Sequence, residues 1–119
     1  MSGYAKLPLG GKDRGFKFDI KTVGSIIGSL GITVNDLSDA MTGNPFTTYP
    51  VIIIEGLKRN AEKAKTPAPD DDEVLEWIEE DGLLSENVLA IIKAFSESIV
   101  SLLPQAEKPV PNGKAKPKK

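Results

Sequence analysis

The stretch Gly10-Gly11-Lys12-Asp13-Arg14-Gly15-Phe16-Lys17-Phe18-Asp19-Ile20 decides the fold of the N-terminal part of the chain. Its first six residues are rich in glycine and charge, a composition typical of a turn. Residues 16–20 then alternate strictly between apolar and charged side chains, as a strand with one buried face does. With the preceding Tyr4-Ala5-Lys6-Leu7, the stretch predicts a β-hairpin, and Pro8 places the first strand at an edge or ends it.

Two short helices are predicted after the hairpin. The first is indicated by apolar residues that share one helical face: Val23, Ile26, Ile27 and Leu30. Gly31 is expected to end it, because glycine readily adopts the left-handed conformation that closes many helices. Thr33 and Asp36 have the spacing of a capping box and predict the start of the second helix, which Gly43-Asn44-Pro45 ends.

A third helix is expected to begin near residues 48–50, because Pro50 is tolerated in a first turn, where its missing N–H costs nothing. Residues 65–69 contain Pro67 and Pro69 and predict a linker. Asp70 and Glu73 predict the capped start of a fourth helix, which Gly82 ends.

The last predicted helix has the most extensive apolar pattern. Ser85 is expected to cap it and Pro104 to stop it. Its stripe contains seven large apolar residues: Val88, Ile91, Ile92, Phe95, Ile99, Leu102 and Leu103. This is more than the core of a small domain needs, so part of the stripe is expected to contact a partner or a second copy of the chain.

The residues assigned to partner contact are Trp77, Ile92, Phe95, Ile99, Leu102 and Leu103. Trp77 is included because tryptophan is enriched at binding hot spots. The alternative is that Trp77 and the first half of the last helix belong to the core.

Together these signals predict an α+β fold that is mostly α. Residues 1–103 are expected to form one domain, in which an N-terminal β-hairpin packs on a bundle of four to five short helices. Residues 104–119 contain four prolines and five lysines and predict a disordered tail.

Composition argues against an enzyme. The chain has no cysteine and no histidine, which excludes disulfides, zinc sites of those residues and a Ser-His-Asp triad. Gly24, Gly28 and Gly31 lack the spacing of a dinucleotide or phosphate loop. Residues 70–73 lack the alternating ligands of a calcium loop, and helix capping explains them. We therefore expect no catalytic residue, no cofactor and no metal.

Charge is distributed unevenly around a net value of −2. Residues 70–86 hold nine acidic side chains and no basic one, whereas residues 104–119 hold five lysines and one glutamate. An acidic domain argues against a nucleic-acid partner, because phosphate contacts require clustered Lys and Arg. The apolar run of residues 51–54 is far shorter than the roughly 20 residues of a spanning helix, so we expect a cytoplasmic protein with no membrane partner.

Six local segments, taken in chain order, carry a resemblance to a known family. They are Phe16-Lys17-Phe18-Asp19-Ile20, Gly31-Ile32-Thr33-Val34-Asn35-Asp36-Leu37, Asn44-Pro45-Phe46, Gly56-Leu57-Lys58-Arg59-Asn60-Ala61-Glu62, Val74-Leu75-Glu76-Trp77-Ile78-Glu79 and Ala94-Phe95-Ser96-Glu97-Ser98. In order and layout they resemble the tail assembly chaperones of long-tailed phages, prophages and gene transfer agents. The resemblance covers most of residues 4–103.

The resemblance implies a non-enzymatic protein that binds the tape measure protein, a very long, helical and aggregation-prone partner, until tail-tube subunits polymerise around it. It also implies action in the cytoplasm of the bacterial host and absence from the mature virion. Two other functions stay open at this point. One is a structural tail or head-tail connector component, and the other is a small regulatory adaptor that uses the lysine tail.

Overall fold

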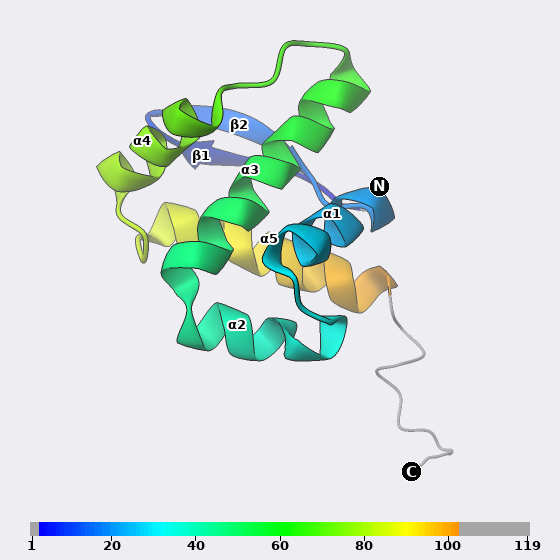
Figure 1. Cartoon of the computed structure of the whole chain (residues 1–119). Helices are drawn as coiled ribbons and strands as arrows, with labels where there is room; N and C mark the ends of the chain where they lie inside the picture. The colour runs from blue at the N-terminus through cyan, green and yellow to red at the C-terminus, as the bar shows by residue number, and fades with distance from the viewer. Residues whose placement is uncertain (1–2, 103–119) are drawn as a thin grey trace.

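A two-stranded hairpin and five α-helices make up residues 3–102, the part of the chain that this computed structural model describes (Figure 1). In chain order the elements are β1 (Tyr4–Leu9), β2 (Lys12–Lys17), α1 (Ile20–Leu30), the 3-10 helix η1 (Val34–Asp36), α2 (Leu37–Gly43), α3 (Pro45–Ala64), α4 (Asp71–Asp81) and α5 (Glu86–Leu102). The predicted α+β, mostly α fold class is confirmed. The predicted boundary after residue 103 and the predicted disorder of residues 104–119 lie outside the described residues.

The hairpin turn is shorter than predicted. Leu9 pairs with Lys12 in the antiparallel register, so only Gly10 and Gly11 form the turn. Both have positive φ angles, 63° and 84°, as a two-residue hairpin turn with the twist of its strands requires. The prediction of a turn over residues 10–15 was wrong, because β2 already begins at Lys12.

The alternating segment after the turn has one buried face, with one exception. Phe16 and Phe18 are fully buried, as the alternation predicts. Ile20 is 74% exposed, because the strand ends before it and Asp19 begins a helix. The Asp19 carboxylate accepts hydrogen bonds from the Thr22 backbone N–H at 3.1 Å and from the Thr22 hydroxyl at 3.0 Å. Ile20 is the first residue of α1, so its side chain follows the helical periodicity and does not join Phe16 and Phe18 on the buried face.

Helix ends follow the predicted signals at some positions. Gly31 has a left-handed φ of 69°, and its N–H donates to the Ile27 carbonyl at 2.9 Å, which closes α1 as expected. The Ser85 hydroxyl oxygen accepts a hydrogen bond from the Val88 N–H at 3.3 Å and caps α5.

Other helix starts differ from prediction. The Thr33 hydroxyl donates to the Asp36 carboxylate at 3.0 Å, and no capping bond to the backbone forms, so a 3-10 turn precedes α2. Helix α3 begins at Pro45, which takes the first-turn position that was assigned to Pro50. Asp70 precedes α4 as predicted, but its side chain makes no capping hydrogen bond.

Helix α3 is the centre of the fold. It packs against β2 and against α1, α2, α4 and α5 (Figure 1). At Gly56 the helix lies close to the residue that follows β2, since a Cβ atom there would lie 2.5 Å from the Phe18 ring. Phe18 in turn meets Phe95 of α5 edge-to-face, with ring centroids 5.4 Å apart. The hairpin is therefore joined to the helices through aromatic packing in the core.

Candidate binding surface

Two of the residues assigned to partner contact lie in the core. Phe95 is 0% exposed and Ile92 is 5% exposed. The hairpin is the cause, because β1 packs along α5 and α3 covers the same helix. A side chain without solvent exposure is not available to a partner, so we correct the assignment of Ile92 and Phe95 and place them in the core.

Trp77 has a local structural partner. The Arg14 guanidinium lies over its ring, 3.4 Å from the ring centroid. Arg14 Nε also donates to the Leu9 carbonyl at 2.6 Å, and a Cβ atom on Gly10 would lie 2.6 Å from the Trp77 ring. Trp77 thus holds the hairpin turn against α4, which favours the core interpretation over a free interface anchor.

Ile99 and Leu102 are partly exposed and lie where α5 leaves the core. Ile99 belongs to two adjoining hollows. The first has a volume of about 590 Å³ and lies between α2 and α5. The second has a volume of about 360 Å³ and lies between α1 and the end of α5, where Leu102 also lines it. Val34 and Ile99 line both, so we treat the two hollows as one feature, the apolar groove. Leu103, the last assigned residue, lies outside the described part of the chain.

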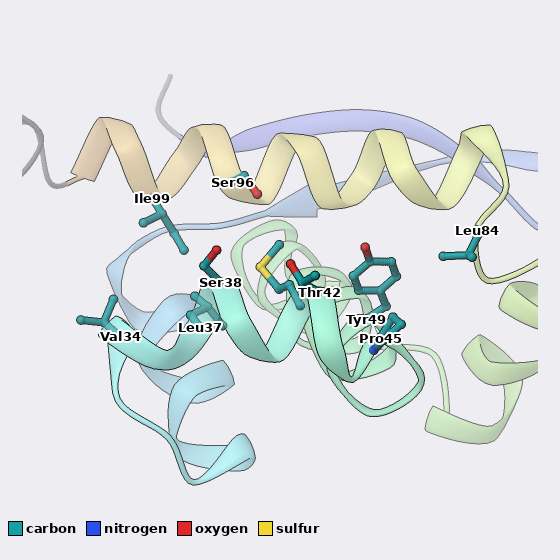
Figure 2. A pocket seen from close by; sticks show the side chains of 10 residues that line it. Val34, Leu37, Ser38, Thr42, Pro45, Tyr49, Leu84, Ser96 and Ile99 are labelled. Atoms are coloured by element: carbon teal, nitrogen blue, oxygen red, sulfur yellow. The ribbon is translucent and has the colours of Figure 1, made fainter.

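The groove is built by short segments from every helix except α4. Ile20, Val23 and Ile27 of α1 line one end. Leu37 and Met41 of α2 and Tyr49 of α3 line the middle, and Leu84 in the turn before α5 lines the other end. Figure 2 shows Ile99 projecting from α5 toward α2, and Ser38 and Thr42 projecting from α2 toward α5.

Among residues 3–102, no charged side chain lines the groove. Its surface combines aliphatic side chains with four hydroxyl groups, on Ser38, Thr42, Tyr49 and Ser96. Several of the aliphatic side chains are well exposed to solvent, among them Val34 at 43% and Leu84 at 64%. Burying one such side chain fully stabilises a complex by about 1.5–3 kcal/mol, so the groove is suited to an apolar, uncharged segment.

A cluster of four charged side chains joins the start of α1 to α3. Arg59 donates to Asp19 and to Glu62, each at 2.8 Å, and Lys21 contacts Glu62 at 3.2 Å. Burial alone would raise the pKa of Asp19, but hydrogen bonds from Arg59 and Thr22 outweigh it and lower the pKa to about 2. This cluster joins α1 to α3, and none of its residues lines the groove.

Neither a metal centre nor a membrane span is present between residues 3 and 102. No group of three or more acidic side chains in this range is arranged to hold a metal ion. None of the helices formed by these residues combines the length and apolar character needed to cross a membrane.

Most of the groove residues were not predicted from the sequence. Ile20, Val34, Met41 and Leu84 stand at element starts or in short elements, where no long periodic pattern marks them. The available signal was the presence of large apolar residues next to capping positions, as at Asp19-Ile20 and Thr33-Val34.

Comparisons of the chain with protein-family models, with curated proteins and with solved structures each find no match.

Proposed function

We propose that this protein is a phage tail assembly chaperone that shields apolar segments of the tape measure protein. The observation that carries the proposal is an uncharged apolar groove on an otherwise acidic domain. Residues 3–102 contain 16 acidic and 10 basic side chains, a net charge of −6, and none of these groups lines the groove. The resemblance of the chain to tail assembly chaperones supplies the identity of the client.

The groove suits one apolar face of an amphipathic helix. Binding of this kind places apolar side chains of the client at helical spacing into a complementary apolar channel. Val34, Ile99 and Leu102 would contact the client, while the acidic exterior keeps the complex soluble through its net charge. The client is released when tail-tube subunits bind it more tightly, so no catalytic group is required.

The proposed function also implies where the protein acts. The protein acts in the cytoplasm of the bacterial host during tail assembly and is not retained in the virion. A second copy of the chain is the other partner that the groove suits. Several copies bound along one long client would also form an oligomer, because all of them bind the same client molecule.

Co-expression with the tape measure protein of the same phage or prophage tests the proposal. We expect the tape measure protein to be soluble, and to co-purify, only when this chain is present. A client that stays insoluble and does not co-purify would contradict the proposal. An equal amount of an unrelated acidic protein of similar size serves as the expression control.

Two other outcomes would assign a different function. Recovery of the chain from purified virions at stoichiometric amounts would identify a structural tail or head-tail connector component. Binding to DNA that weakens with salt and disappears when Lys114, Lys116, Lys118 and Lys119 are changed to glutamate would identify a regulatory adaptor.

A further inference from the structure

Helix α5 carries a second row of side chains beside the apolar groove. Leu89, Lys93, Ser96 and Val100 follow one another at spacings of four, three and four residues, so they lie along one face of the helix. Leu89 is 43% exposed and Val100 is 50% exposed, and Lys93 between them is also exposed. We propose that these four residues, the outer row of α5, form the interface of a homodimer in which the α5 helices of two copies pack antiparallel.

The apolar residues of the outer row fix the register of such a pair. In an antiparallel pair of identical helices a twofold axis relates the two copies, so each contact occurs twice, once on each side of the axis. If Leu89 contacts Val100 of the second copy, the axis lies midway between these two positions, at the level of Ala94 and Phe95. Each half of the interface then buries one exposed leucine against one exposed valine.

Charge complementarity places the axis at the same level. Lys93 and Glu97, one turn apart on α5, are both exposed, and no ion pair joins either of them to another of residues 3–102. If Lys93 pairs with Glu97 of the second copy, the axis lies level with Phe95. The apolar and the charged contacts thus agree to within one residue, which is about 1.5 Å along a helix. Two independent features of α5 favour one antiparallel register.

The second copy would also cover the mouth of the groove. Ser96 belongs to the outer row and lines the groove as well, and Ile99 projects from the adjoining side of α5 toward α2 (Figure 2). Val34 and Leu84, at opposite ends of the groove, are 43% and 64% exposed. Extended apolar surface of this kind is typical of an interaction site. The dimer would therefore remove both the outer row and the groove from water.

Dimerisation would compete with client binding, because both use the groove. Only the fraction of chains that are monomeric could bind a client, and the apparent affinity for the client would fall by that fraction. This consequence rests on the proposed function. The dimer does not, because it requires only copies of this chain.

Charge exchange between the two sites tests the dimer in the full-length protein. Lys93→Glu would place glutamates opposite each other on both sides of the axis, and Glu97→Lys would place lysines there. We expect sedimentation equilibrium to show that each variant raises the dissociation constant of the homodimer at least about tenfold, because like charges then face each other. Lys63→Glu, which changes an exposed lysine near the end of α3, is the matched control and should leave the constant unchanged.

Mixing the two variants distinguishes a contact between copies from one within a copy. In an equal mixture, Lys93→Glu supplies the acidic groups and Glu97→Lys the basic groups that the other requires at both sites. We expect the mixture to form a heterodimer about as tight as the unaltered homodimer. An ion pair within one chain would not be restored by mixing.

Three outcomes would overturn the proposal: a chain that stays monomeric up to about 1 mM, a dimer that neither variant weakens, and weakened dimers that mixing does not restore. Circular dichroism verifies that the variants are folded. The result is independent of the chaperone assay. A dimer restored by mixing, in a chain that binds no client, would contradict the proposed function alone. A monomeric chain that binds the client would contradict this inference alone.

Discussion

The guanidinium of Arg14 in β2 lies 3.4 Å from the centroid of the Trp77 ring in α4. The same guanidinium donates to the carbonyls of Leu9 and Gly10, at 2.6 Å and 3.5 Å, and the Gly10 N–H donates to Asp81 at 3.2 Å. Two contacts therefore attach the hairpin turn to α4: Arg14 with Trp77, and Gly10 with Asp81. The attachment lies on α4, which contributes no residue to the apolar groove.

This relationship predicts a structural role for the tryptophan. Trp77→Ala removes a large, partly buried ring and leaves Arg14 without its aromatic contact, so we expect the free energy of unfolding to fall by about 2–4 kcal/mol. Urea denaturation measures the change. Leu75→Ala, on the same helix, serves as the exposed control and should change stability by less than about 1 kcal/mol. Unchanged stability with loss of client binding would instead make Trp77 an interface residue.

The two halves of the α5 stripe should respond differently to truncation. Phe95→Ala removes a fully buried ring and should destabilise the protein by about 3–5 kcal/mol. Ile99→Ala, at the groove, should cost less than half as much, because its side chain remains partly in solvent. Thermal or urea unfolding of both variants measures the difference. Equal losses would mean that Ile99 is as much a core residue as Phe95.

Local signals were sufficient to predict the hairpin and the five α-helices, but not the two-residue turn or the 3-10 helix η1. Gly10-Gly11 and the alternation after it predict the hairpin, and Gly31 and Ser85 mark helix boundaries where the structure has them. Proline was ambiguous, since Pro45 and Pro50 each suit a first turn. The helix begins at the first of them and carries the second inside.

The groove could not be predicted in the same way. The stripe of α5 is apolar along its whole length, and periodicity does not say which part of it the hairpin covers. That depends on the packing of β1 against α5, which is a contact between distant parts of the sequence. The groove residues Ile20, Val34 and Leu84 also come from different elements, and only the tertiary arrangement brings them together.

Two glycines in helices should respond in opposite directions to the same change. Gly56→Ala places a Cβ atom 2.5 Å from the Phe18 ring in the core, and we expect a loss of about 1–3 kcal/mol of stability. Gly28→Ala in α1 meets no neighbouring atom within 4 Å and should stabilise the protein by up to about 1 kcal/mol, because alanine is the better helix former. Urea denaturation of both variants tests the packing of α3 on the hairpin. A neutral Gly56→Ala would show that this packing is looser than described.

The Asp19–Arg59 pair should make the free energy of unfolding depend on pH in the acidic range. The pKa of Asp19 is about 2 in the folded protein and near its ordinary value of 3.8 when unfolded, so between these values the unfolded state binds more protons. The stabilisation is complete above about pH 4 and is lost as the pH falls toward 2. Since the pair is partly exposed, we expect it to contribute about 1 kcal/mol. Asp19→Asn keeps a capping side chain but removes the charge, and its stability deficit at pH 6 should shrink toward pH 2. A deficit that is independent of pH would contradict the assignment.

A charge in the groove should reduce client binding without unfolding the domain. Val34 is 43% exposed and lines both hollows, so Val34→Asp places a carboxylate where an apolar client segment would have to bury it. The lost apolar contact and the desolvation of the charge should weaken client binding at least about tenfold, which corresponds to about 1.4 kcal/mol. Leu75→Asp introduces the same charge on α4, away from the groove, and should leave binding unchanged. Pull-down of the tape measure protein at several concentrations measures the affinity, and circular dichroism verifies that both variants are folded. Equal binding by the two folded variants would exclude the groove as the client site, even if the protein proves to be a chaperone.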